Sequence, residues 1–591
     1  MSGPGAGASY TGALLGWVAP LMSLLLASVL AGALSASPAP IDPRLAILDA
    51  MKEELDRNRT QLKLGENPPP YFISYAVKDL TQAFVAARYG ALFDDSTNRD
   101  RRVFADVRVG SHELDNSVNE EFDFNFSLKG TSYTTRKEAP LDDDLTALRT
   151  ALWLITDEKY KTGLFNLLKK KGEAVYVVDD PKKPPSFSRE QPSTFIGPAT
   201  TYTFDRARWS ALVRKVSARF NEAGKIFDTD VRVTADKEIR YFVNSEGSRI
   251  VTELTFYGVH LFAVTRADDG QLLDDSRDYY GFTEAELPSD AKLMKDAEFL
   301  IQELLALRAA PPIDPYTGPA ILEAEAAGVL FHEAVGHRLE GDRMDNDAEG
   351  KTFKGQIGRA VLPPFITIVD DPTVAKFGGV SLNGFYRYDD EGIAAQRVPL
   401  VESGVLKNFL LSRHPVDGFL KSNGHGRGQG NRRPVARMAN TIAFSTKQVS
   451  DAELKQMLIA EAKRQGKPYG LIIRDIQGGN TNTSSFGYQA FKGIPRMVFR
   501  VDVRDGKETL VRGVEVVGTP LTAMSKIVAT GRTQGVFNGF CGAESGNVPV
   551  STVAPPTLLR EIELQRVVEG RDRPPLLPSP ASEPSQRAEA R

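Results

Sequence analysis

The sequence has very little cysteine, since Cys541 is the only one among 591 residues. No intramolecular disulfide can form, so Cys541 can act only as a thiol, a thiolate or a small apolar side chain. An excess of charge of one sign is also absent: 73 Lys and Arg stand against 76 Asp and Glu, a net charge of −3. This balance removes the simplest electrostatic case for nucleic-acid binding. The hydrophobic (41 %) and charged (25 %) fractions argue against a mostly disordered, fibrous or polytopic membrane protein.

Charge is missing altogether from the N-terminal segment, where Asp42 is the first charged side chain. The apolar run is densest over 21–34, about the length of a signal-peptide core and short for a membrane span. We expect residues 1–36 to be an export signal that directs the chain to the periplasm or the extracellular space. An uncleaved membrane anchor is the alternative; a buried helix also stays open, because no Lys or Arg precedes the run. At the other end, the proline-rich segment 571–591 predicts a disordered tail.

A run of prolines at 311–312, after Ala309-Ala310, divides the remaining chain. We predict an α+β fold with an N-terminal α/β-type domain over 42–309 and a C-terminal domain over 310–570 that is rich in antiparallel sheet. Periodicity and turn signals predict helices over 45–64, 145–171, 206–223, 290–307 and 520–530, and strands over 71–76, 103–109, 231–233, 240–243, 251–265, 365–369, 496–503 and 510–517.

The most informative segment, 328–342, contains His332-Glu333-x-x-x-His337 on a predicted helix. In the common zinc-peptidase motif the histidines are four residues apart, about 40° around the helix, but here they are five apart, about 140°. A one-residue π-bulge would bring the two rings together, and Gly336 tolerates such a distortion. We therefore predict that His332 and His337 bind one metal through a distorted helix that belongs to the C-terminal domain. Two unrelated histidines at a helix end remain the alternative.

This segment and several others resemble the TldD/PmbA family of zinc metallopeptidases, in particular its zinc-bearing TldD branch. The other similar segments are Val369-Asp370-Asp371-Pro372, Tyr388-Asp389-Asp390-Glu391-Gly392, Gly424-His425-Gly426-Arg427, Arg437-Met438-Ala439-Asn440-Thr441 and Phe540-Cys541-Gly542. The resemblance extends over 42–566 and implies one zinc ion per chain. It also implies that the ion is held by His332, His337 and a C-terminal cysteine, which here can only be Cys541. Three protein ligands and one open position are usual at a catalytic zinc.

Glu333 is the expected general base, because it follows the first ligand and could take a proton from zinc-bound water and pass it to the leaving amine. The sequence thus predicts a zinc peptidase of the HExxxH type that acts on extended or unfolded peptides, with 310–570 as the metallopeptidase domain. A non-catalytic binding or assembly subunit on the same scaffold is the alternative. The sequence contains no Gly-x-Ser-x-Gly motif, so it does not support a hydrolase with another nucleophile.

The resemblance further implies a homodimer or a heterodimer with a zinc-less PmbA- or TldE-type homologue. Contact with a membrane is expected only if segment 1–36 stays uncleaved. His425 is a candidate hydrogen-bond donor to the transition state, and Met438, Asn440 and Thr441 resemble the segment that borders the family's site, where an extended peptide could pair with a strand edge. The acidic run 389–391 could bind a cation, but a turn explains it more simply.

Overall fold

The computed structural model describes residues 42–117, 138–174, 184–346, 351–481, 483, 491–518, 520–567 and 572–580. The predicted export signal lies outside these residues, and only 572–580 of the predicted tail lie within them. Among the described residues, every sheet lies within the unit Leu48–Arg591. The domain boundary predicted at residue 310 stays a prediction. In the described part of the chain, no helix combines the length and apolarity needed to cross a membrane.

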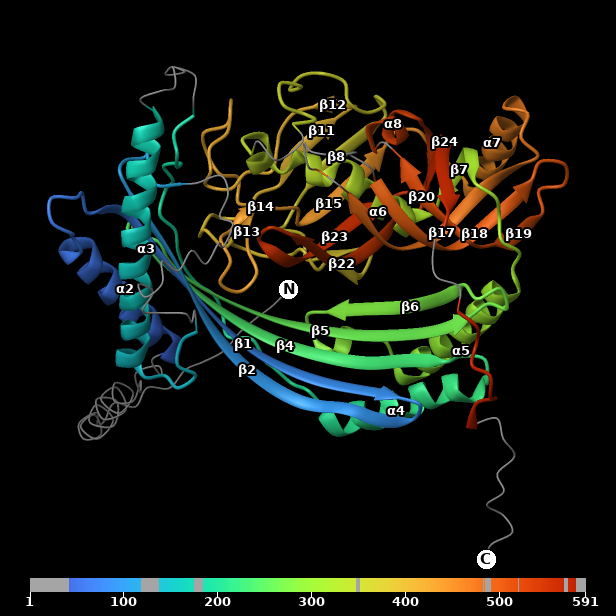
Figure 1. The fold of residues 1–591 in the computed structure, drawn as a ribbon, viewed down its shortest axis with the longest axis horizontal. Coiled ribbons are helices and arrows are strands. Elements are labelled where there is room, and N and C mark those ends of the chain that lie inside the picture. Colours follow the sequence, from blue (N-terminus) through green and yellow to red (C-terminus); the bar gives the residue numbers. More distant parts are fainter. Residues whose placement is uncertain are drawn as a thin grey trace, which may run out of the picture. The chain divides into compact units, whose positions relative to one another are not determined.

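Long antiparallel strands make up the first sheet, in the order β2-β1-β4-β5, with β6 paired to β5 and short β3 parallel to β5 (Figure 1). Their bounds are β1 (Pro70–Arg88), β2 (Ala91–Val109), β3 (Thr194–Ile196), β4 (Asp228–Asn244), β5 (Arg249–Arg266) and β6 (Leu272–Gly281). The predicted strands 231–233 and 240–243 are both parts of β4. The polar residues between them stay in the strand because β1 and β5 pair with β4 on either side.

Residues alternate between the two faces of this sheet. On β4, Val231, Val233 and Ala235 join the hydrophobic core under helices α4 and α5, while the even-numbered residues face the opposite side. The helices of this half are α2 (Pro43–Gln61), α3 (Leu145–Ala174), α4 (Arg206–Glu222) and α5 (Asp290–Ala309), with the 3₁₀ turn η1 (Glu284–Glu286). Trp209, fully buried on α4, anchors this packing. Helices α4 and α5 therefore do not cover the even-numbered face of β4.

Two further sheets form the C-terminal half. A six-stranded sheet has the order β12-β11-β8-β15-β23-β22, with β22 at its end. An eight-stranded sheet has the order β16-β21-β24-β20-β18-β17-β7 with β19 on β18, and pairing of β24 with β7 closes five of its strands into a ring. The strands are β7 (Tyr316–Leu322), β8 (Ile366–Asp370), β11 (Val398–Glu402), β12 (Val405–Leu406), β15 (Asn440–Ser445), β16 (Gln448–Val449), β17 (Tyr469–Thr481), β18 (Phe491–Asp502), β19 (Glu508–Val511), β20 (Val514–Gly518), β21 (Ile527–Gly531), β22 (Gly535–Ala543), β23 (Gly546–Ala554) and β24 (Thr557–Arg566).

The remaining C-terminal elements are the two-stranded ribbons β9 (Lys376–Phe377) with β10 (Val380–Ser381) and β13 (Gly426–Arg427) with β14 (Val435–Ala436), the helices α6 (Ala324–Ala334), α7 (Asp451–Arg464) and α8 (Pro520–Ser525), and the 3₁₀ turns η2 (Gly336–Leu339) and η3 (Gly341–Met344). The predicted α+β class with much antiparallel sheet is confirmed. The helix predicted over 520–530 is wrong beyond Ser525, because the β-branched run that starts at Ile527 pairs with β24 as β21.

Candidate metal centre

Helix α6 carries the first part of the candidate site and lies between the two C-terminal sheets, in contact with β17 on one side and with β22 and β23 on the other. All its residues from Ala326 to Ala334 are buried. A Cβ at Gly328 would lie 3.1 Å from Cβ of Phe537 on β22. The glycine thus lets the helix approach β22 closely, one turn before His332.

The two histidines of the motif are separated by a change of helix type. Helix α6 ends at Ala334, and His337 lies on the 3₁₀ turn η2. The helix stops and restarts instead of widening, so the distortion is a break and not a π-bulge. A Cβ at Gly336 would overlap Sδ of Met438, so a glycine is required where the chain passes that side chain. The ring centroids of His332 and His337 lie 5.0 Å apart at an interplanar angle of 86°.

Strand β22 brings Cys541 to the two histidines. One potential ligand atom from each of His332, His337 and Cys541 lies within 4.8 Å of the other two, and all three residues are buried. Sγ of Cys541 is 3.3 Å from Nε2 of His337. Two such ligands of one tetrahedral zinc would be about 3.5 Å apart. In addition, Nδ1 of His332 is buried without a hydrogen-bond partner in the described structure. Two imidazoles and a thiol form a donor set that suits zinc.

Glu340 holds His337 in place from behind. Its carboxylate lies 3.1 Å from Nδ1 of His337 and accepts a 2.8 Å hydrogen bond from Arg343. Arg437 lies 3.3 Å from the other carboxylate oxygen and also donates to the backbone oxygen of Cys541 at 2.7 Å. A carboxylate on the far nitrogen of a ligating histidine is the common arrangement that fixes its tautomer. Glu340 therefore positions His337 and leaves Nε2 free for a metal.

These contacts change the charge state of the metal-free residues. Burial raises the pKa of the Cys541 thiol, but His332 and His337 outweigh it and bring the pKa down to about 4. Burial lowers the pKa of His337, but Glu340 and Cys541 outweigh it and raise the pKa to about 10. The pKa of Glu340 lies well below its usual range, because His337 and Arg343 overcome the effect of burial. At neutral pH Cys541 is a thiolate, the form that binds metals.

Glu333 faces the same space as the three potential ligands. Its Oε2 lies 3.9 Å from Nε2 of His337. A Cβ at Gly479 of β17 would lie 2.5 Å from Cγ of Glu333, so a glycine is needed where the strand crosses this side chain. Glu333, the two histidines and Cys541 all line a cavity of about 490 Å³. A glutamate beside the donor set, but not part of it, is the arrangement that a general base requires.

Comparison with known proteins places this site in a family. Residues 315–566 match the PmbA/TldA metallopeptidase C-terminal domain. A metalloprotease of Archaeoglobus fulgidus is 31 % identical over 327 residues, which cover 55 % of this chain and 70 % of that protein. The chain belongs to the PmbA/TldD family of metallopeptidases. The resemblance found in the sequence is thereby confirmed.

Two further relatives agree. A protein of Saccharolobus solfataricus named zinc metalloprotease TldD homolog is 26 % identical over 249 residues, or 42 % of this chain and 51 % of that protein. The crystal structure of TldE from Thermococcus kodakarensis has a TM-score of 0.58 at 14 % identity, over 87 % of this chain and 100 % of the other. At this identity the structural match shows the shared fold alone.

Four other residues that the sequence associates with the site do not line the metal cavity. His425, Met438, Asn440 and Thr441 are each at most 1 % exposed. Asp370 gathers three of them, since it lies 3.2 Å from Nε2 of His425 and accepts from the amide of Asn440 and the hydroxyl of Thr441. Their burial disagrees with the predicted substrate-facing role. The contacts of Asp370 with these residues fix the segment in which Met438 lies against Gly336.

The acidic run behaves as a turn, as the sequence predicts. Asp389 accepts hydrogen bonds from the backbone amides of Glu391, Ile393 and Gly426. Asp390 forms a 2.7 Å ion pair with Lys78 of β1 and so joins the first sheet to the C-terminal half. Sequence reasoning missed two contributors to the site, Glu340 as the partner of His337 and Tyr280 as a wall of the cavity. The sequence predicts no strand at Tyr280, and the cavity that this residue lines depends on β22 from the other half of the chain.

Proposed function

We propose that this member of the PmbA/TldD family is a zinc-dependent peptidase that hydrolyses extended or unfolded peptides. The observation that carries the proposal is the convergence of His332, His337 and Cys541 in a cavity that also contains Glu333. Two nitrogens and one thiolate are zinc ligands in known catalytic sites, where a fourth position stays open. The three residues would hold one zinc ion per chain, and the name of the Saccharolobus relative supports the choice of metal.

When bound, zinc supplies a Lewis acid that polarises a carbonyl and lowers the pKa of water. The chain's own residues supply the rest. Glu333 accepts a proton from the attacking water at a carboxylate oxygen and delivers it to the leaving amine. Gly479, packed against Cγ of Glu333, restricts where that carboxylate can point. Glu340 keeps the proton of His337 on Nδ1, so that the lone pair of Nε2 stays directed at the cavity.

The shape of the site supports an extended substrate. The metal cavity of about 490 Å³ shares Asp278, Tyr280 and Phe540 with a second cavity of about 770 Å³, which lies along the even-numbered face of the first sheet. A peptide chain in an extended conformation could occupy both, whereas a folded domain could not enter. This favours unfolded segments and short peptides as substrates.

A non-catalytic assembly subunit on the same scaffold is the second candidate, and the fold shared with TldE does not separate it from the first. Both candidates agree with a further proposal, that the chain forms a homodimer or pairs with a TldE-type homologue. The test is metal analysis of the purified protein together with digestion of unfolded casein, with and without chelator. We expect one zinc per chain and cleavage that the chelator abolishes. A natively folded, zinc-free and inactive protein would point to the second candidate.

Glu333→Gln separates catalysis from metal binding. The variant should keep its zinc and lose about 10²- to 10⁴-fold in turnover, because an amide cannot accept the proton. Glu402→Gln, at an exposed position on β11, is the matched control and should be as active as the wild type. Unchanged turnover in Glu333→Gln would exclude this residue as the general base.

Export remains a separate proposal, which rests on the uncharged apolar segment before Asp42. We propose cleavage near residues 33–37 and release to the periplasm or the extracellular space. Mass spectrometry of the mature N-terminus in the soluble fraction is the test. An intact Met1 in that fraction would contradict cleavage, and an intact Met1 in the membrane fraction would support the anchor instead.

A further inference from the structure

Three aromatic side chains stand where the two cavities meet, and we call them the aromatic wall: Phe256 of β5, Tyr280 of β6 and Phe540 of β22. Tyr280 and Phe540 line both cavities, and Phe256 lines the larger one. The rings of Phe256 and Tyr280 stack at 5.5 Å and 27°, and Phe540 meets them edge-on at 6.0 Å and 6.1 Å. These are the spacings of interacting aromatic pairs.

The sequence of the first sheet builds two members of this wall. Gly258 pairs directly with Tyr280 across β5 and β6. A Cβ at Gly258 would lie at van der Waals distance, 3.6 Å, from the Tyr280 ring and 2.9 Å from Oγ1 of Thr234, so the ring lies beside the Gly258 backbone. Phe256 is two residues earlier on the same face of β5, within stacking distance. The glycine and the two aromatic residues therefore form one apolar surface on a face that also carries many polar side chains.

Phe540 supplies the third member from the metal side. It precedes Cys541 on β22, so strand alternation turns the two side chains to opposite faces. Cys541 is 5 % exposed and Phe540 is 55 % exposed, although Phe540 lines two cavities. Water reaches this large apolar ring inside the cavity. An apolar ligand that displaced the water would therefore bind with a favourable free energy. The wall is therefore incompletely buried at Phe540. This residue is the neighbour in sequence of Cys541, a proposed zinc ligand.

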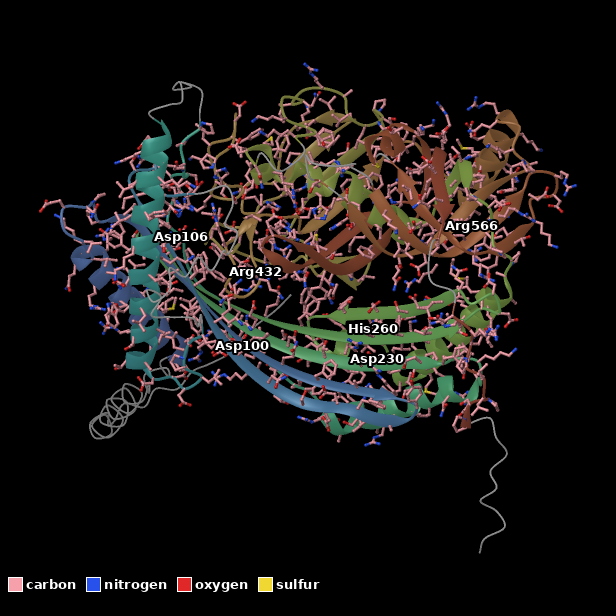
Figure 2. The ribbon with its side chains drawn as sticks, in the orientation of Figure 1. Asp100, Asp106, Asp230, His260, Arg432 and Arg566 are labelled. Atoms are coloured by element: carbon pink, nitrogen blue, oxygen red, sulfur yellow. The ribbon has the colours of Figure 1, made fainter. Side chains whose placement is uncertain are left out.

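Polar side chains surround the wall. Figure 2 shows Asp100, His260 and Arg432, which line the larger cavity from both halves of the chain. Asp278 lines both cavities next to Tyr280 and bonds to Nδ1 of His260 at 2.5 Å. An acidic side chain at the wall would meet the carboxylate of Asp278, and a neutral one would not. The rings and Asp278 therefore favour an apolar group over an acidic one at the wall itself, while basic residues such as Lys78, Arg102 and Arg240 also line the larger cavity.

We propose that the aromatic wall is a subsite for one large aromatic or aliphatic side chain of the peptide substrate, adjacent to the bond that is cleaved. The inference deepens the proposed function and rests on it. It predicts that cleavage sites carry Phe, Tyr, Trp, Leu or Met at one fixed position and disfavour Asp and Glu there. The rest of the peptide chain would lie along the polar face of the first sheet.

The test measures kcat/KM of zinc-loaded protein for peptide pairs that differ only in Phe or Ala at the preferred position, found by mass spectrometry of digested unfolded casein. Phe540→Ala should reduce the Phe-over-Ala ratio about tenfold or more, the size expected for loss of an apolar subsite. Tyr280→Ala, on the other half of the chain, should do the same if Phe540→Ala fails to fold. Tyr280→Phe keeps the ring and should keep the ratio.

Phe299→Ala is the matched control, since Phe299 is 46 % exposed on α5 and lines neither cavity. Zinc content is measured for every variant, because Phe540 is next to Cys541. A ratio that is unchanged in zinc-replete Phe540→Ala and Tyr280→Ala would overturn the subsite and leave the peptidase standing. A preference for Lys or Arg at the wall would also overturn it. Zinc-loaded wild type that cleaves no peptide would instead overturn the proposed function.

Discussion

The carboxylate of Glu340 and the imidazole of His337 form a fixed pair: Oε2 lies 3.1 Å from Nδ1, while Nε2 of the same ring faces Sγ of Cys541 at 3.3 Å. Glu340 is 1 % exposed, and Arg343 and Arg437 lie against its two oxygens. The orientation of the second histidine is therefore set by the protein itself. Such preorganisation predicts how substitutions behind the site should act.

Glu340→Gln should weaken zinc binding about 10- to 100-fold, the usual effect of removing the partner of a ligating histidine. The amide has the size of the carboxylate but holds Nδ1–H less strongly. Competition with a chromophoric chelator measures the affinity. Glu402→Gln, at an exposed position on β11, should bind zinc like the wild type. Equal affinities for the two variants would contradict the role of Glu340.

Zinc affinity should decrease as the pH is lowered. A ligating imidazole must be neutral, but metal-free His337 holds its proton up to a pKa of about 10, while Cys541 with a pKa of about 4 has already lost its own. Between these values zinc displaces one proton, so the dissociation constant should rise about tenfold for each pH unit downward. Titrations at pH 6 to 9 test the slope. A flat profile would mean that His337 is neutral before zinc binds.

Cys541→Ala should abolish stoichiometric zinc binding, because two buried histidines alone leave the donor set incomplete. Metal analysis after dialysis measures the effect. The fold should persist, since Cys541 contributes one small side chain to a large core. Full retention of zinc would rule out the cysteine as a ligand.

Gly336→Ala should destabilise the protein by about 1–3 kcal/mol, the cost of overpacking a filled core. The added methyl would overlap Sδ of Met438, so Met438→Ala in the same chain should recover part of the loss. Denaturant midpoints of the two single variants and the double variant measure the coupling. Gly172→Ala, on helix α3 with open space around its Cβ position, is the control and should be neutral or stabilising. Additive effects at 336 and 438 would contradict the contact.

The local part of the site could be predicted from the sequence, and the long-range part could not. His332, Glu333 and His337 are close in the chain, so their spacing alone indicates a metal. Cys541 is 204 residues beyond His337, and only family resemblance connects the two. The helix breaks after Ala334 and does not form a π-bulge. The break lies where Met438 approaches from a distant segment, which the local spacing does not reveal.

The sequence also identifies strands better than it identifies what their faces meet. The alternation in β4 and β5 predicts that one face is buried and the other free. It does not reveal that the free face lines a cavity next to Cys541, or that Glu340 contacts a ring nitrogen and not solvent. His425 shows the opposite error: the sequence makes it a candidate hydrogen-bond donor to the transition state, yet it is completely buried and lies 3.2 Å from Asp370.

The alternation of the first sheet has a consequence for how this protein can change. Around the cavity, the odd-numbered residues of β4 and β5 belong to the hydrophobic core, whereas the even-numbered Phe256, Gly258 and Tyr280 lie on the face that lines the cavity. Under the proposed subsite, substitutions at Phe256 and Tyr280 should alter which peptides are accepted while the residues around Cys541 stay the same. Two of the three members of the wall would then vary independently of the metal ligands, whereas Phe540, next to Cys541, would not.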